Sequence, residues 1–283
     1  MDVGFAQYVS EFFATMTLLI FGVGVVAGVV LKGTKSNGSG WIVITFGWGL
    51  GVAMAVYVGG WISGAHINPA VTIAEWSMGT LTFAEMLGYM GAQVAGGFVG
   101  AAIILGMYYP HYKAEEDKAA KLATFSTAPE IRHTPANYFS EVVGTFMLLF
   151  GIQGIFATMG NFDVTGSGGA GEAIAPLLVG LLVGVIGMSL GGTTGYAINP
   201  ARDLGPRLTH FLLPVPDKGD SDWEYSWVPI VGPLIGGPLG ALTYHLALGA
   251  GDFEHMGMLI GFIIAFVVVQ IATFFISVEK RNA

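Results

Sequence analysis

The sequence has little charge, no cysteine and no cluster of basic residues. Charged residues make up 11% of the 283 residues, against roughly 25% in an average soluble domain. The absence of cysteine excludes disulfides and thiolate metal sites. The net charge of −8 comes from acidic loops, whereas nucleic acid or an anionic lipid surface would require basic clusters. Residues 1–10 contain no lysine or arginine, so we expect the first apolar segment to be retained rather than cleaved as a signal.

Apolar residues and glycine are abundant instead. The chain is 53% hydrophobic, and its 44 glycines are about twice the usual share of about 7%. A helix needs about 20 apolar residues to cross a hydrocarbon core of about 30 Å. Seven segments approach this length, namely 8–31, 41–61, 83–108, 136–159, 173–190, 227–248 and 257–278. They predict an all-α membrane protein. The longest connection, 110–135, contains KAEEDKAAK and is predicted to be a solvated surface loop.

One tripeptide occurs twice in matching surroundings, within SGAHINPAVT and within GYAINPARDLGPR. Its two copies are Asn68, Pro69, Ala70 and Asn199, Pro200, Ala201. Asparagine is a preferred N-cap and proline a preferred first helical residue. Each copy begins an apolar piece of about ten residues, too short to span a bilayer. The sequence therefore predicts two half-helices that enter the membrane without crossing it.

The two halves of the chain are repeats of one another. Glu11 lies 57 residues before Asn68 (68 − 11), and Glu141 lies 58 before Asn199 (199 − 141). A glycine precedes each asparagine by four residues. If each repeat holds three spans, an odd number, the second repeat is inverted in the membrane. The half-helices then enter from opposite sides and meet N-terminus to N-terminus at the midplane.

This geometry favours a pore for neutral solutes. Each half-helix N-terminus carries about half a positive charge, so two of them facing a narrow lumen repel protons and metal ions. Asn68 and Asn199 offer amide donors to a neutral oxygen. Irregular backbone at membrane depth must line a cavity or be buried in protein. We therefore expect an acceptor ladder of pore-lining carbonyls at Gly64, Ala65, His66, Ile67, Gly195, Tyr196 and Ala197, with the adjoining Ile198.

Taken with these motifs, the chain resembles the aquaporin superfamily, and more narrowly its glycerol-facilitator branch, over about residues 5–249. The resemblance also rests on WGLGVAMAVY, TFSTAP and NPARDLGPR. In the family, an aspartate after the second Asn-Pro-Ala-Arg, here Asp203, marks members that conduct solutes. The resemblance implies an inverted repeat of 3+3 transmembrane helices with two re-entrant half-helices. It also implies a homotetramer with one pore per subunit, and no cofactor or metal.

By the same resemblance, the outer constriction is formed by Trp48, Gly187, Tyr196 and Arg202. Trp48 and the Tyr196 ring would offer an apolar wall to a carbon backbone, and Arg202 would bond hydroxyls and repel cations. We expect Gly187 to give the slot its width.

The buried acidic residues need partners, because a carboxylate within an apolar span costs roughly 2.5 to 3.5 kcal/mol on insertion scales. As in the family, Glu11 and Glu141 are expected to accept hydrogen bonds from backbone N–H groups of the re-entrant loops; proton relay is the alternative. His66 is interpreted as a loop brace rather than a pH switch. Asp203 and Arg207, spaced i and i+4, can be read as a helix-surface pair worth a few tenths of a kcal/mol.

The solute stays open at this level. The resemblance implies passive conduction of glycerol, related uncharged solutes and water. Facilitators commonly have phenylalanine where this chain has Tyr196, whose hydroxyl would add a polar group and narrow the slot. Protonated lactic acid, dihydroxyacetone or urea are therefore alternative solutes. An alternating-access transporter is the rival class, but it usually needs a coupling-ion site. No nucleophile, metal cluster or phosphate loop in the sequence indicates an enzyme.

The resemblance ends before the seventh apolar segment. We expect a channel domain at 1–250, with repeats at about 5–110 and 136–250. Residues 251–283 would form an additional transmembrane segment that packs peripherally and places Ala283 on the face opposite Met1. The expected location is the plasma membrane of a bacterium. The family topology would place Met1 in the cytoplasm, although most basic residues then fall outside, against the positive-inside tendency.

Overall fold

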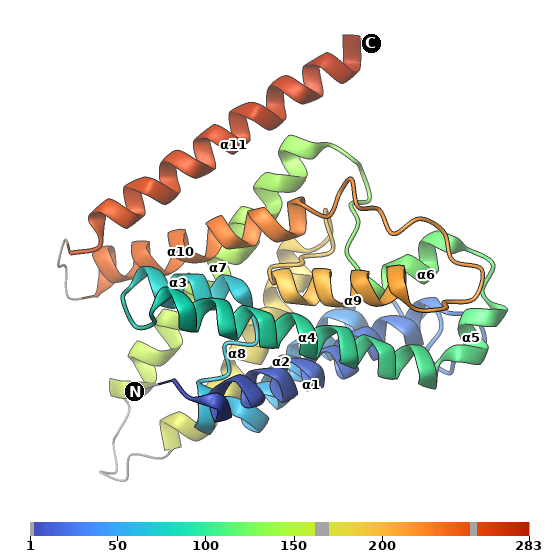
Figure 1. Ribbon diagram of the computed structural model, residues 1–283, viewed down its shortest axis with the longest axis horizontal. Helices are drawn as coiled ribbons and strands as arrows, with labels where there is room; N and C mark the ends of the chain where they lie inside the picture. Colours follow the sequence, from blue (N-terminus) through green and yellow to red (C-terminus); the bar gives the residue numbers. More distant parts are fainter. Residues whose placement is uncertain (1–2, 162–169, 250–253, 283) are drawn as a thin grey trace.

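The computed structural model describes residues 3–161, 170–249 and 254–282, and the secondary structure assigned in this part of the chain is helical (Figure 1). The first repeat comprises α1 (Phe5–Val30), α2 (Trp41–Ser63), α3 (Pro69–Ser77) and α4 (Phe83–Met107). The second comprises α7 (Thr134–Asn161), α8 (Ala170–Leu190), α9 (Pro200–Leu212) and α10 (Val228–Leu248). Between them lie α5 (Tyr109–Ala114) and α6 (Lys118–Phe125), and α11 (Met256–Asn282) follows.

The repeats are joined through their short helices. Within each repeat the first long helix packs against the last, α1 on α4 and α7 on α10. The half-helix α3 packs mainly against α10, and α9 packs mainly against α4. Each half-helix is therefore held by the opposite repeat, so the two irregular loops that precede them are brought to the same place.

Glycines allow the long helices to approach closely. A Cβ added at Gly96 of α4 would lie 2.3 Å from the carbonyl oxygen of Phe12 in α1. In the second repeat, a Cβ at Gly236 of α10 would lie 2.3 Å from the carbonyl oxygen of Val142 in α7. Small residues at such contacts are how helices associate in lipid, where burial of apolar surface gives no advantage. The high glycine content thus serves the interfaces between helices.

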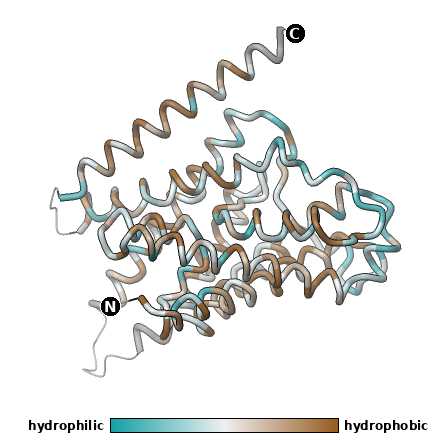
Figure 2. Tube along the Cα trace, viewed as in Figure 1, coloured by the Kyte–Doolittle hydropathy of each residue, from teal (hydrophilic) through white to brown (hydrophobic). Residues whose placement is uncertain are grey.

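The predicted transmembrane architecture is confirmed. Among the described residues, seven helices are long and apolar enough to cross a membrane, each within a few residues of its predicted segment. The half-helices α3 and α9 begin at Pro69 and Pro200, as the Asn-Pro pairs predict. Figure 2 shows hydrophobic residues along the long helices and hydrophilic residues gathered around α5, α6 and the connections near them.

The prediction of a solvated surface loop over 110–135 was wrong in part: most of the charged run is exposed, but the segment is largely helical. This segment forms α5 and α6, and it contributes to the protein interior. Tyr112 and Phe125 are fully buried with their rings stacked at 5.5 Å. Lys121, within the charged run, is 1% exposed because its amine donates to the carbonyls of Pro216 and Asp217, at 2.7 and 3.2 Å. Hydropathy missed this because the partners lie about 95 residues away in the sequence.

The seventh long helix lies on the outside of the bundle. Helix α11 contacts α7 and α10, and only 6% of its most apolar window is buried. Gln270 donates from Nε2 to the carbonyl of Pro135 at 3.2 Å, which ties the helix to the start of α7. Figure 1 shows α11 beginning beside the end of α10, on the side where α1 begins, and running back toward the other side. The expectation for Met1 and Ala283 themselves falls outside the described residues.

Removal of residues 251–283 is expected to leave solute flux per folded protein within about twofold of the full chain, because no α11 residue lines the cavity described below. Stopped-flow light scattering on proteoliposomes of both chains measures this, with the amount of folded protein matched by size-exclusion chromatography. A loss of flux at matched folded protein would contradict the peripheral placement of α11.

Candidate functional site

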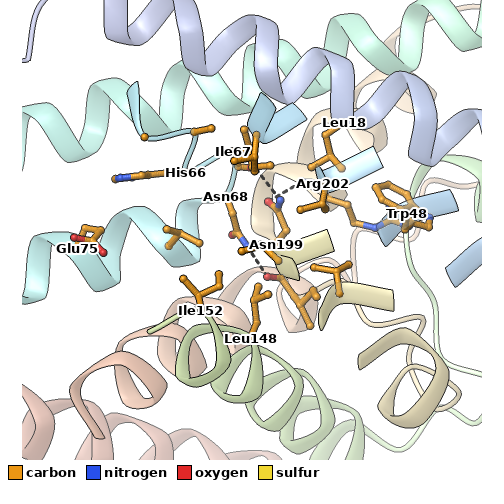
Figure 3. A pocket seen from close by; sticks show the side chains of 18 of the residues that line it. Leu18, Trp48, His66, Ile67, Asn68, Glu75, Leu148, Ile152, Asn199 and Arg202 are labelled. Atoms are coloured by element: carbon orange, nitrogen blue, oxygen red, sulfur yellow. Dashed lines mark hydrogen bonds between the residues drawn. The ribbon is translucent and has the colours of Figure 1, made fainter. Parts of the chain in front are cut away.

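The two asparagines of the repeated tripeptides hold each other's loops. The side-chain amide of Asn68 donates to the carbonyl of Ile198, and that of Asn199 donates to the carbonyl of Ile67, both at 2.8 Å (Figure 3). Each Oδ1 caps its own half-helix, accepting from Ala70 N at 2.8 Å and from Ala201 N at 3.0 Å. Since an amide group carries two N–H donors, one donor of each asparagine is left for another oxygen. The capping residues of the two half-helices thus form one polar site at the centre of the fold.

The loops before the half-helices have an uncommon backbone. Ile67 and Ile198 have φ of 47° and 43°, in the left-handed region that β-branched residues rarely adopt. Gly64 and Gly195, at 80° and 81°, begin the same conformation in each repeat. Backbone held in this region costs on the order of 1 to 3 kcal/mol per residue and persists only where surrounding contacts fix it.

Two buried glutamates supply those contacts. Glu11, fully buried, accepts from His66 N at 2.9 Å and Ile67 N at 2.7 Å. In the second repeat, Glu141 accepts from Ala197 N at 3.1 Å and Ile198 N at 2.9 Å. A hydroxyl adds to each set, from Ser63 in the first and Thr194 in the second. These are the backbone hydrogen bonds expected of both glutamates, and they satisfy the buried carboxylate oxygens.

A cavity of about 330 Å³ runs along this core. Its lining includes eleven of the residues singled out from the sequence, namely Trp48, Gly64, Ala65, His66, Ile67, Asn68, Tyr196, Ala197, Ile198, Asn199 and Arg202. Gly187 and Gly195 are not in that lining. The ring of His66 packs against Tyr89 and its Nδ1 lies 3.2 Å from the Thr72 hydroxyl, in keeping with a loop brace.

The lining also contains apolar residues that sequence reasoning did not single out, namely Leu18, Val52, Val56, Val71, Leu148, Ile152, Phe156, Val179 and Val183. They come from five helices, α1, α2, α3, α7 and α8, and make the cavity lining mostly apolar. Nothing in a single sequence separates them from other apolar residues of the spans. Only the Asn68 spacing would have indicated Val71, which lies one helical turn further on.

Arg202 and Trp48 form a charged and aromatic pair at one end of the cavity (Figure 3). The Arg202 guanidinium lies 4.1 Å from the centre of the Trp48 ring, a distance at which a cation is attracted to an aromatic face. Its NH1 donates to the carbonyl of Phe125 at 3.2 Å. Arginine has five N–H donors, so a solute oxygen can still bond to this group. Arg202 is 6% exposed, so its side chain does not extend to the membrane surface.

The role expected for Gly187 needs correction. A Cβ on this residue would lie 2.6 Å from Tyr196 Cζ and 2.9 Å from Tyr196 Oη. Gly187 therefore makes room for the Tyr196 ring, and it affects the width of the cavity through that ring. The Tyr196 hydroxyl was expected to add a polar group to the slot. It is instead buried, with no hydrogen-bond partner among the described residues, although Tyr196 itself lines the cavity.

The interpretation of Asp203 and Arg207 as a surface pair was wrong. Both side chains are fully buried, and Arg207 NH2 lies 2.7 Å from Asp203 Oδ1. Asp203 Oδ2 accepts from both the backbone N and the hydroxyl of Thr127, at 2.8 Å each. Thr127 is two residues from Phe125, whose carbonyl holds Arg202. The pair therefore anchors the segment that positions Arg202. The i, i+4 spacing alone could not reveal the contact between Asp203 and Thr127, because these residues lie 76 positions apart in the sequence.

This fold and this cavity define a membrane channel built as an inverted repeat, with two half-helices meeting at its centre. The model of the family described as "Major intrinsic protein" matches residues 3–244, and the chain belongs to this family. The all-helical fold is shared with solved members: the X-ray structure of the aquaglyceroporin from Plasmodium falciparum superposes with a TM-score of 0.72 and 28% identity, over 86% of this chain and 96% of that chain.

Bacterial relatives are more similar in sequence. The probable glycerol uptake facilitator protein of Thermotoga maritima is 55% identical over 238 residues, covering 84% of this chain and 97% of the relative. The glycerol uptake facilitator protein of Bacillus subtilis is 54% identical over 237 residues, covering 84% and 83%. The matched stretches cover most of both chains in each comparison.

Proposed function

We propose that this protein is a passive channel for glycerol and related small uncharged solutes, and for water, and that it excludes protons and ions. The observation that carries the proposal is the cavity itself, in which Arg202 and the asparagine amides lie along a lining that is otherwise mostly apolar. A polyol has hydroxyls along one edge and a carbon skeleton along the other, so it can replace its lost hydration on one side and contact apolar atoms on the other.

The roles of the site residues follow from this proposal. Trp48, the Tyr196 ring and Arg202 form the selectivity constriction, and Gly187 sets its width by accommodating the ring. Asn68 and Asn199 donate to the solute at the centre, where the two half-helix N-termini repel cations. The carbonyls of residues 64–66, 196 and 197, which the asparagines do not use, accept from solute hydroxyls. Conduction through many weak contacts requires no cofactor, and the family to which the chain belongs consists of channels, not enzymes.

The cellular setting is part of the same proposal. Similarity to bacterial facilitators supports a plasma-membrane location in a bacterium, and we place the beginning of α1 on the cytoplasmic side. We propose a homotetramer with one pore in each subunit. The apolar side chains that α1, α2 and α8 expose in the single chain are available for lipid and for neighbouring subunits, among them Phe21, Phe46, Leu50, Leu181 and Val185.

A solute panel tests the function. Proteoliposomes are exposed to inward gradients of glycerol, urea or lactic acid at low pH, and re-swelling is recorded by stopped-flow light scattering. We expect rapid glycerol entry through the wild-type protein. The rate of glycerol entry is expected to change strongly in Arg202→Ala, because the variant removes the charged group of the constriction. Rapid water flow without glycerol entry would overturn the glycerol assignment. Entry of the protonated acid alone would establish a channel for neutral organic acids instead.

A further inference from the structure

A carboxylate that the sequence motifs did not indicate lies on the cavity lining, at the end away from Arg202. Glu75 is in the last turn of α3, seven residues after Asn68 (75 − 68). Asn68, Val71 and Glu75 are spaced i, i+3 and i+7, so they share one helix face, and all three line the cavity. In Figure 3, Glu75 and Arg202 lie on opposite sides of the asparagine pair.

The charges along the cavity are therefore of opposite sign at its two ends. Among the lining residues that the structure describes, Arg202 and Glu75 are the two with formally charged side chains. Arg202 and the two half-helix N-termini make one end and the centre positive. A positive lumen repels cations but attracts small anions, and acidic side chains along a pore disfavour anions. Glu75 supplies that negative charge where a permeating anion would have to leave or enter.

The carboxylate of Glu75 is held in place and keeps free acceptor capacity. Thr80 Oγ1 lies 2.9 Å from both Glu75 Oε2 and the Glu75 carbonyl oxygen, and the Thr80 backbone N donates to that carbonyl at 3.2 Å. An ionised carboxylate has about four acceptor sites. The Thr80 hydroxyl is the one side-chain donor near this carboxylate among the described residues, so acceptor sites remain for the hydroxyls of a solute in the cavity.

A negative charge is electrostatically unfavourable at the position of Glu75 in α3. The C-terminal end of a helix carries about half a negative charge, which disfavours a carboxylate in the last turn. Glu75 is half-buried there, so part of its hydration is lost as well. A leucine or glutamine would satisfy the helix better, which leaves the cavity as the place where the charge has an effect.

We propose that Glu75 is a specificity-determining residue of the pore. Its carboxylate rejects small anions at the end opposite Arg202 and accepts hydrogen bonds from the hydroxyls of a neutral solute. The inference rests on the proposed function only in taking this cavity as the conducting path. The half-helix N-termini reject cations and Glu75 rejects anions, so the pore is selective for uncharged solutes that enter from either side of the membrane.

Nitrate flux tests the charge, because nitrate stays ionised at neutral pH. Proteoliposomes with a potassium diffusion potential set by valinomycin are compared for wild type, Glu75→Gln and Glu116→Gln. Glu75→Gln keeps the shape and removes the charge, and we expect nitrate permeability to rise about tenfold. Glu116→Gln changes the net charge equally at a side chain that is 91% exposed and outside the cavity lining, so nitrate permeability is expected to stay at the wild-type value.

Glycerol flux in the same vesicles tests the acceptor role. Glu75→Gln retains an acceptor oxygen and is expected to conduct glycerol within about twofold of wild type, whereas Glu75→Leu is expected to lower glycerol flux severalfold. Unchanged nitrate permeability in folded Glu75→Gln, or full glycerol flux in Glu75→Leu, overturns the inference. A wild-type protein that conducts no glycerol overturns the proposed function instead, and the nitrate comparison then still decides the charge of the path.

Discussion

Gly187→Val is expected to lower glycerol flux at least about tenfold while the protein still folds. The Cβ of the new side chain would lie 2.6 Å from Tyr196 Cζ, so the Tyr196 ring must move. Because Tyr196 lines the cavity, the displaced ring is expected to narrow it. Stopped-flow re-swelling in a glycerol gradient measures the loss, normalised to folded protein by size-exclusion chromatography. Retention of wild-type flux would show that residue 187 does not control the width of the path.

A second substitution shows whether the block acts through the tyrosine. Gly187→Val combined with Tyr196→Ala is expected to recover a large part of the glycerol flux, because the displaced ring is gone. Recovery would not occur if residue 187 itself filled the lumen. Tyr196→Phe is the matched control, expected within about twofold of wild type, since the hydroxyl is buried and has no hydrogen-bond partner among the described residues.

Asp203→Ala is expected to destabilise the protein by about 3 to 5 kcal/mol, because it leaves the Arg207 guanidinium buried without its carboxylate. An exposed i, i+4 pair would account for only about 0.3 to 0.5 kcal/mol. Thermal unfolding in detergent measures the difference, as a fall in Tm on the order of 10 °C. The flux of the remaining folded protein is expected to fall too, because the segment that holds Arg202 through the Phe125 carbonyl loses its anchor at Thr127.

Lys118→Ala is the control for that measurement. Lys118 pairs with Asp217 at 3.7 Å, but their side chains are 56% and 74% exposed, so the loss is expected within about 0.5 kcal/mol. Equal unfolding temperatures for the two variants would mean that the Asp203 and Arg207 pair behaves as a surface pair, and would contradict the anchoring role.

The parts of the fold set by local chemistry were predictable from the sequence. Asn-Pro pairs predicted that α3 and α9 begin at Pro69 and Pro200, because capping and proline geometry act within one turn. Segment length and hydropathy predicted the seven spans. Repeat spacing predicted that the two asparagines meet, since an inverted repeat places equivalent residues about one axis.

The remaining features depend on contacts between residues far apart in the chain. The sequence predicts Lys121 to be a surface lysine, because its partners, the carbonyls of Pro216 and Asp217, are far away in the chain. The sequence predicts that Gly187 leaves space in the lumen, whereas in the structure the Tyr196 ring occupies the space beside Gly187. Glu75 carries no motif, although its i+7 spacing from Asn68 is a signal that could have placed it on the pore face. Periodicity gives the face of a helix but not what packs against it.

The temperature and concentration dependence of glycerol entry into wild-type proteoliposomes tests most directly whether the two half-helices frame a passive conduit. A fixed polar and apolar path predicts glycerol flux that rises linearly with the gradient, has a low activation energy and is unaffected by a proton gradient. Flux that saturates, has a high activation energy or follows the proton gradient would contradict this account and indicate an alternating-access carrier.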